Sequence, residues 1–357
     1  MYIKMKQLKD ILEGIFDIED NIDNVDESVK EQIKRFLKDN FSGASSCKIS
    51  DKPNADGKYE VSSSKDIEAR MYITSLADRL FVWANVDGNF SCWNCTLLTS
   101  LEGAPKEVGG DFTCRVCNSL TSLEGAPEKV GGFFDCSDCK SLKSLKGAPK
   151  KVGEGFHCGD CVLLKSLEGA PKEIGGSFFC RGCNSLTSLE GAPKEVSNGF
   201  HCEECDSLTS LKGAPKEVGG TFNCHSCISL TSLKGAPKEV RGGFYCNSCK
   251  SLTSLEGAPE KVCGNFNCYY CYSLTSLEGA PEKVCYFDCR YCESLTSLKG
   301  APKKVGSNFN CNNCKSLTSL EGAPEKVGGD FCCRNCWVEF TVDDVKKVSN
   351  VKGNIYI

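Results

Sequence analysis

The sequence is dominated by one short unit that recurs at a fixed spacing. Between successive units the period is 22 residues, except for a single step of 21 residues between Phe266 and Phe287, and every linker keeps Gly-Ala-Pro. Self-similarity at such a period indicates a stacked array with one continuous core, so we expect a single solenoid and not two or three globular domains. The motif Phe-x-Cys-x-x-Cys begins at twelve positions: Phe90, Phe112, Phe134, Phe156, Phe178, Phe200, Phe222, Phe244, Phe266, Phe287, Phe309 and Phe331.

Each unit is predicted to form one coil of this solenoid. The phenylalanine and the first cysteine are two residues apart, so both side chains leave the same face of a short strand. The following Ser-Leu-Thr-Ser-Leu buries two leucines on a return segment, and the proline of Gly-Ala-Pro prevents a long helix there. One coil buries too little apolar surface to fold alone, so stacking must stabilise it. Twelve strands about 4.8 Å apart predict an array roughly 50–60 Å long.

The flanking segments are predicted to cap the array. Apolar residues recur at helical spacing in Met5–Phe16 and in Glu27–Phe41, whereas Ser42–Gly57 has the composition of a linker or loop. Thr341 is placed to cap a short helix, and residues 351–357 repeat the strand pattern once more. We therefore divide the chain into four parts: a helical cap over 1–45, a linker and degenerate capping coils over 46–89, the twelve repeats over 90–336, and a C-terminal cap over 337–357.

Charge and composition exclude several classes of partner. The formal net charge is -4, with no concentrated basic segment, which argues against nucleic acid or an anionic membrane as a general partner. No signal peptide and no apolar run long enough to cross a membrane is visible, so we expect a cytoplasmic protein. The chain also carries 28 cysteines, and in a protein kept inside a cell reduced thiols or metal ligands are expected instead of disulfides.

The repeat resembles the leucine-rich repeat family, whose pattern L-x-x-L-x-L-x-x-N/C-x-L runs through a strand. Phe112 and Cys114 match the two strand leucines, Cys117 matches the asparagine-or-cysteine position, and Leu120 and Leu123 match the leucines that follow. The resemblance covers about 250 residues. It implies a mainly β repeat solenoid, a parallel stack of about twelve to fourteen coils. Cysteine on the strand and Gly-Gly before it depart from the pattern, so a flatter β-solenoid is the alternative. Cysteine-rich arrays of this kind also resemble hypothetical repeat proteins of bacteriophages and bacteria.

The paired cysteines have two explanations. Cys92, Cys95, Cys114 and Cys117, like the equivalent pairs in later repeats, have a spacing that could bind zinc or an iron–sulfur cluster. Alternatively, they form a ladder of small buried hydrophobic side chains. The ladder is favoured because cysteine replaces core positions in every coil, so we expect no cofactor, with zinc as the alternative. Cys332 lies between Phe331 and Cys333 and is predicted to face outward, which makes it the best candidate for an exposed, oxidisable thiol, although a solvated side chain without a role is favoured.

Sequence variation between repeats predicts a binding surface. The return segments hardly vary, whereas the residue between the phenylalanine and the first cysteine, and the two residues inside Cys-x-x-Cys, vary freely. Aromatic side chains on an exposed ordered face are common anchors of recognition. The candidate binding residues on this face are Tyr245, Tyr269, Tyr270, Tyr286, Tyr291, His157, Phe179 and His201.

These patterns favour a non-enzymatic binding or scaffold protein of leucine-rich-repeat type that recognises a protein partner. A metal-binding cysteine-rich solenoid is one alternative, and a structural component of a larger assembly such as a phage particle is another. No nucleophile with its base and no phosphate-binding loop recurs, so no catalytic residue is assigned. The sequence leaves the identity of the partner and homo-oligomerisation open.

Overall fold

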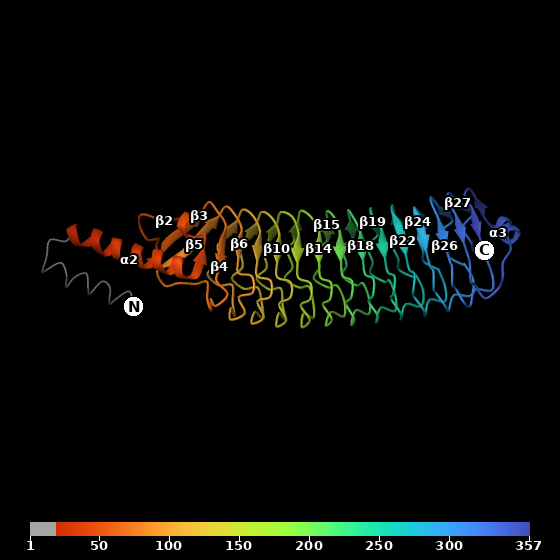
Figure 1. The fold of residues 1–357 in the computed structure, drawn as a ribbon, viewed down its shortest axis with the longest axis horizontal. Helices are drawn as coiled ribbons and strands as arrows, with labels where there is room; N and C mark the ends of the chain where they lie inside the picture. The colour runs from red at the N-terminus through yellow and green to blue at the C-terminus, as the bar shows by residue number, and fades with distance from the viewer. Residues whose placement is uncertain (1–18) are drawn as a thin grey trace.

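The computed structural model describes residues 19–357 and shows an elongated parallel β-solenoid, with helix α2 at one end and helix α3 at the other (Figure 1). Its largest sheet has fifteen strands, which at a spacing of about 4.8 Å extend over roughly 65–70 Å. The predicted fold class, a mainly β repeat solenoid with a helical cap at its N-terminal end, is confirmed. No helix in residues 19–357 is long and apolar enough to cross a membrane.

The predicted strand of each coil contains the motif phenylalanine. These strands stack in parallel with each phenylalanine opposite the next, as Phe134 is opposite Phe112 and Phe156, and we call the fifteen-stranded sheet that they form the Phe sheet. Its central strands are β6 (Phe90–Ser91), β8 (Phe112–Thr113), β10 (Phe134–Asp135), β12 (Phe156–His157), β14 (Phe178–Phe179), β16 (Phe200–His201), β18 (Phe222–Asn223), β20 (Phe244–Tyr245), β22 (Asn265–Asn267), β24 (Tyr286–Asp288), β26 (Phe309–Asn310) and β28 (Phe331–Cys332).

Each coil also contains a second strand, which the sequence analysis did not anticipate. It follows Gly-Ala-Pro, presents a charged residue outward and buries a valine or isoleucine, and it stacks into three shorter sheets that we call the Val sheets. The stack is interrupted between β13 and β15 and between β21 and β23. These strands are β7 (Glu107–Val108), β9 (Lys129–Val130), β11 (Lys151–Val152), β13 (Glu173–Ile174), β15 (Glu195–Val196), β17 (Glu217–Val218), β19 (Glu239–Val240), β21 (Lys261–Val262), β23 (Lys283–Val284), β25 (Lys304–Val305) and β27 (Lys326–Val327).

The 21-residue step lies at the second interruption. Only Cys285 separates Val284 of β23 from strand β24, and β23 still pairs with β25 across the shorter step. The Phe sheet continues without a break, because Phe266 still lies opposite Phe287. The missing residue is therefore absorbed in the turn between the two strands of one coil.

The core repeats the same side chains in every coil. The motif phenylalanine, the two leucines and the Val-strand residue are buried, as are both motif cysteines in all but the last copy, where Cys336 is half-buried. Phenylalanine rings of neighbouring coils lie with centroids 5.1–5.7 Å apart, from Phe90 to Phe331. This continuous apolar stack gives each coil the buried surface that it lacks alone.

Glycine is required at the turn that closes each coil. Gly125, for example, has φ 87°, a left-handed conformation that side chains disfavour, and a Cβ there would overlap the backbone of Glu102 in the preceding coil. The glycine of Gly-Ala-Pro therefore allows both the turn and the close approach of successive coils.

The N-terminal cap is a helix followed by short strands. Helix α2 (Glu19–Asn40) begins earlier than the segment Glu27–Phe41 predicted from the sequence, and the other predicted helix, Met5–Phe16, lies outside the described residues. The segment expected as a linker carries β2 (Cys47–Ile49), which pairs with β3 (Tyr59–Ser63). The remaining elements are β1 (Phe41–Ser42), the 3-10 helix η1 (Ala44–Ser46), β4 (Ile67–Ala69) and β5 (Phe81–Val86).

The C-terminal segment contains a short helix and two strands. Thr341 caps helix α3 (Val342–Val348) in a capping box with Asp344. Strands β29 (Asn350–Val351) and β30 (Ile355–Tyr356) then pair in parallel with β27 and β28. The predicted final echo of the repeat strand is therefore confirmed.

Candidate recognition surface

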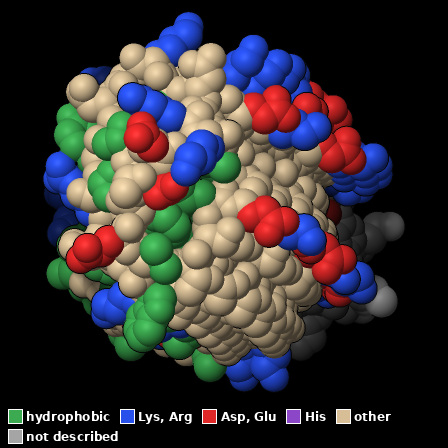
Figure 2. All heavy atoms as spheres, turned by 90° about the vertical axis from the view of Figure 1, so that its right-hand side faces the viewer, with side chains coloured by type: hydrophobic (Ala, Val, Ile, Leu, Met, Phe, Trp, Pro, Cys, Tyr) green, Lys and Arg blue, Asp and Glu red, His purple; other side chains and the backbone are tan. Residues whose placement is uncertain are grey.

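The two kinds of sheet present very different outer faces. On the Val sheets, lysines and glutamates of neighbouring coils form exposed ion pairs, such as Lys129 Nζ to Glu107 Oε1 at 2.8 Å and Lys261 Nζ to Glu239 Oε1 at 2.8 Å. Figure 2, a view of the end that carries α3, shows basic and acidic side chains side by side in rows. Exposed pairs of this kind contribute little to stability, and they make a uniform solvated surface.

The outer face of the Phe sheet is chemically varied. We call it the variable face and define it as the residue between phenylalanine and the first cysteine of each motif, together with the two residues inside Cys-x-x-Cys. The second of those inner residues lies in a left-handed turn in every copy, with φ 56–63° at the non-glycine positions and 65° at Gly182. The turn directs these side chains away from the core, beside the strand.

An aromatic ladder crosses three consecutive coils of the variable face. The rings of His157 and Phe179 have centroids 4.2 Å apart, and Phe179 stacks on His201 at 4.6 Å. Phe133, which is 39% exposed, packs edge-on against His157 at 5.4 Å. Three of the predicted residues therefore form one contiguous cluster, which Phe133 extends.

Burial controls the charge of the two histidines. It lowers the pKa of His157 and of His201, although the nearby Glu203 carboxylate partly offsets the effect at His201. His201 Nδ1 lies 3.9 Å from Glu203 Oε2, too far for a hydrogen bond. Within residues 19–357, neither His157 Nε2 nor Glu203 Oε2 has a hydrogen-bond partner. The ladder thus presents uncharged rings, and the buried His157 Nε2 beneath its surface is unpaired among the described residues.

A second cluster of predicted residues consists of tyrosines. Tyr270 stacks on Tyr291 with ring centroids 4.5 Å apart, and Tyr269 packs edge-on against Tyr270 at 5.4 Å. Tyr270 and Tyr291 both occupy the left-handed turn, in neighbouring coils. The guanidinium of Arg290 lies 5.6 Å from the ring centroid of Tyr269, within the range of a cation–π interaction.

Asp288 anchors this cluster to the sheet. It is 2% exposed and forms an ion pair with Arg290 at 2.9 Å. The Tyr286 hydroxyl donates a hydrogen bond to Asp288 Oδ2 at 3.1 Å, and burial, followed by the Asp288 charge, raises the pKa of Tyr286 to about 12. Tyr286 is therefore a neutral donor at physiological pH that helps to hold Asp288 in place.

The eight predicted binding residues are all half-buried, but they do not form one patch. Tyr245 lies on β20, apart from both clusters, opposite Asn223 and Asn267. Phe133, Arg290 and Asp288 were not among the candidate binding residues, and Asp288, at a position predicted to face outward, is in fact buried. Asp288 and Arg290 occupy variable positions, so the variation itself was the signal for them, whereas Phe133 lies before its motif and gave none.

The motif cysteines form a ladder of thiols inside the core. In most coils the second cysteine donates its Sγ–H to the carbonyl of the first cysteine of the preceding coil, as Cys117 does to Cys92 at 3.0 Å and Cys139 to Cys114 at 3.1 Å. Burial raises the pKa of Cys136 well above its ordinary value. The Cys136 thiol is thus protonated at neutral pH.

The prediction for Cys332 is wrong. This thiol is half-buried, whereas the exposed cysteines are Cys263 and Cys285 in the turns between strands. Cys332 lies in the Phe sheet between Asn310 of β26 and Tyr356 of β30, which cover it on both sides. Burial accordingly raises the pKa of Cys332.

No metal site emerges from the described part of the chain. Among residues 19–357, no group of three or more histidine, cysteine, aspartate or glutamate side chains is arranged to hold a metal ion. The zinc hypothesis for Cys92, Cys95, Cys114 and Cys117 therefore has no geometric support, and metal content stays a matter for measurement.

The architecture defines the chain as a parallel β-solenoid with a 22-residue repeat. No known family model and no curated protein matches it. Among solved structures, it is similar to a leucine-rich repeat protein from Bacteroides ovatus, at 16% sequence identity and a TM-score of 0.33, over 86% of this chain and 98% of that chain. A likeness at this level gives no basis for assigning a site or a function.

Proposed function

We propose that this chain is a non-enzymatic scaffold of leucine-rich-repeat type that binds a protein partner through the variable face. The observation that carries the proposal is the contrast between faces of one regular rod. The core and the Val sheets repeat almost unchanged, whereas the outer positions of the Phe sheet change from coil to coil. Stability requires no such variation, so a surface fitted to a partner explains it.

The chemistry of the variable face suits protein recognition. Tyrosine and arginine are enriched among the residues that dominate binding energy, because they combine a large apolar area with a polar group and few rotatable bonds. Tyr269, Tyr270, Tyr291 and Arg290 already contact one another, so little side-chain entropy is lost on binding. The phenylalanine stack beneath them supplies a rigid support.

The test is affinity capture from lysates of cells that naturally express the protein. Replacing Tyr245, Tyr269 and Tyr291 with serine should abolish capture of the partner while the circular dichroism spectrum stays unchanged. A matched control replaces Glu173, Glu195 and Glu217 of the Val strands with serine and should capture normally. Unchanged capture by the tyrosine variant, or equal loss in both variants, would contradict the proposal.

A further inference from the structure

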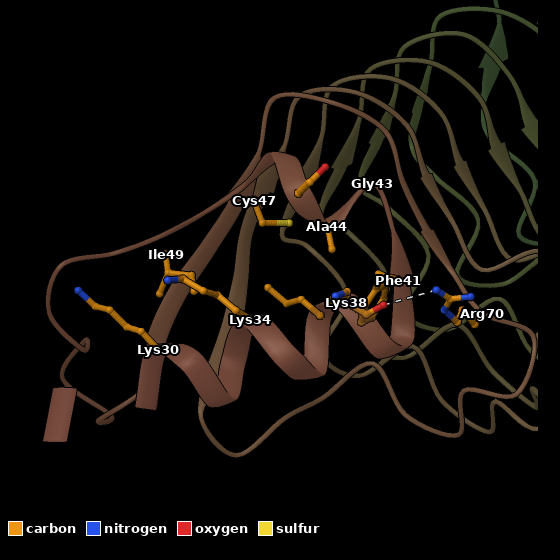
Figure 3. A pocket seen from close by; sticks show the side chains of 11 residues that line it. Lys30, Lys34, Lys38, Phe41, Gly43, Ala44, Cys47, Ile49 and Arg70 are labelled. Carbon is orange, nitrogen blue, oxygen red and sulfur yellow. Dashed lines mark hydrogen bonds between the residues drawn. The ribbon is translucent and has the colours of Figure 1, made fainter. Parts of the chain in front are cut away.

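A groove of about 620 Å³ lies at the N-terminal end, between helix α2 and strand β2, and it plays no part in the proposed function (Figure 3). Its walls have a distinct chemistry. The apolar lining residues are Leu37, Phe41, Ala44, Cys47 and Ile49, and the charged ones are Lys30, Lys34, Lys38 and Arg70. Among residues 19–357, no acidic residue lines this groove, although the whole chain is net negative.

The basic side chains come mainly from one stripe of the helix. Lys30, Lys34 and Lys38 are four residues apart, so they follow one another along one face of α2. Figure 3 shows them along the groove, with Arg70 at its far end. The Arg70 guanidinium donates a hydrogen bond to the Lys38 carbonyl at 3.5 Å, and the Lys30 ammonium lies 5.8 Å from the Tyr59 ring centroid. Lys34 pairs with Glu31 at 2.6 Å.

The opposite wall is the edge of a sheet. β2 is the last strand of its seven-stranded sheet, and within residues 19–357 no strand pairs with its outer side. Ser50 N–H donates to the Glu60 carbonyl at 2.9 Å. Hydrogen-bonded and non-hydrogen-bonded residue pairs alternate in an antiparallel ladder. The backbone N–H and C=O of Lys48 therefore point toward β3, whereas those of Cys47 and Ile49 point outward.

One of these outward groups is satisfied locally. The Cys47 N–H donates to the Ala44 carbonyl at the end of η1. This leaves the Cys47 carbonyl and both backbone groups of Ile49 without a strand partner among the described residues. An exposed edge of this kind can pair with another extended segment.

We propose that this groove binds an acidic, extended segment of a partner protein, which adds to β2 as a further strand. Its backbone pairs with Ile49 and Cys47, and its side chains alternate between the two faces of the new strand. Those on the α2 side are aspartate or glutamate and meet Lys30, Lys38 and Arg70. Apolar side chains beside them contact Ile49, Ala44 and the rim of the apolar floor. Strand addition supplies affinity, and the basic wall selects acidic sequences.

The experiment measures fluorescence anisotropy of a fluorescein-labelled ten-residue peptide that alternates glutamate with threonine, titrated with the full chain. We expect saturable binding that weakens as salt increases, because salt screens the charges. A peptide with lysine in place of glutamate should not bind. A glutamate peptide that is N-methylated at every second residue should lose binding, since it cannot complete the ladder.

Two protein variants locate the site. Replacing Lys30 and Lys38 with glutamate should weaken peptide binding by about tenfold or more, since like charges then face each other. Lys48→Glu makes the same kind of charge change on β2 outside the groove and should leave affinity within about threefold. Hydrogen exchange at the Ile49 amide should slow when the peptide binds.

Several results would overturn the proposal. Equal affinity for the N-methylated peptide would mean attraction by charge alone, without strand addition. Absence of binding to the full chain would mean that the groove is closed to partners, either by the chain's own residues 1–18 or by a second copy. If a second copy closes the groove, light scattering would show a dimer of the unaltered chain. The double variant Lys30→Glu with Lys38→Glu would then be a monomer. Each outcome is distinguishable from failure of the variable face, which lies elsewhere on the molecule.

Discussion

At the scale of single residues, the second position inside Cys-x-x-Cys shows how the repeat shapes its surface. All twelve copies adopt the left-handed conformation there, and the residue types include Asn94, Asp138 and Tyr270. Asparagine and aspartate tolerate this conformation best after glycine, whereas a β-branched side chain is strained in it. Val116, with φ 63°, is therefore a local weakness in an otherwise regular array.

Relieving this strain should stabilise the protein. Val116→Asn is expected to raise the free energy of unfolding by about 1 kcal/mol, because asparagine adopts the left-handed turn at lower cost. The measurement is chemical denaturation at neutral pH. The reverse change in the preceding coil, Asn94→Val, serves as the control and should lower stability. A loss of stability in Val116→Asn would show that the valine side chain contributes packing that outweighs its strain.

The histidine ladder predicts a pH dependence. Burial lowers the pKa of His157 and His201 in the folded protein below the ordinary value of 6.5. As pH falls through 6.5, the histidines of the unfolded chain bind protons more readily than those of the folded chain. The free energy of unfolding should therefore decrease as pH falls from 7 to 5.5. Above this window both states carry neutral histidines, and the full stability is retained.

Denaturation curves across this pH range check the histidine prediction. A variant with phenylalanine at both positions, the residue that the intervening coil carries as Phe179, should show a smaller decrease. An unchanged pH dependence in that variant would assign the effect to other groups.

At the scale of elements, the turn of Gly-Ala-Pro decides whether coils can stack. Gly125 combines a positive φ with a direct approach to the Glu102 backbone. Gly125→Ala should therefore lower the free energy of unfolding by at least about 2 kcal/mol, through conformational strain and steric overlap together. Thermal denaturation is the measurement, and Ala126→Gly, one residue further on, is the matched control with a smaller expected loss. Equal losses would indicate that neither strain nor overlap is specific to Gly125.

The elements also show what a sequence pattern can predict. Phe112 and Cys114 have the period of a strand, Leu120 and Leu123 have constant spacing, and Thr341 has a capping sequence, so all five were placed correctly. The Val strands were missed, because two residues such as Glu107–Val108 are too short to show a period. The left-handed turns were also missed, since their residue types differ from coil to coil.

Tertiary contacts set a further limit on prediction. Cys332 was expected to be exposed from its place in the strand alone, but neighbouring strands on both sides cover it. The eight candidate binding residues separate into two clusters and the isolated Tyr245. Residue type alone does not show how far apart such side chains lie along the coil stack, so this separation was not predicted. The groove beside β2 depends on where α2 packs, and no local pattern indicates that.

At the scale of the whole molecule, the rod is held together by a core of phenylalanine, leucine and reduced cysteine. Thiols such as those of Cys117 and Cys139 donate to backbone carbonyls at 3.0 Å and 3.1 Å and do not converge on a common centre. Elemental analysis of untagged protein purified under reducing conditions should find fewer than about one zinc or iron atom per chain. Roughly three to six atoms per chain would instead make the cysteines ligands that hold the fold.

The central claim is that the variable face of this rod, and not the Val sheets, meets the partner. A photo-crosslinking residue placed at Asn223, in the middle of the Phe sheet, tests it most directly against one placed at the exposed Lys216, which directly precedes the Val strand β17. Both variants are irradiated in a lysate of cells that naturally express the protein. We expect a crosslinked partner from Asn223 and little or none from Lys216. Equal yields, or a partner from Lys216 alone, would contradict it.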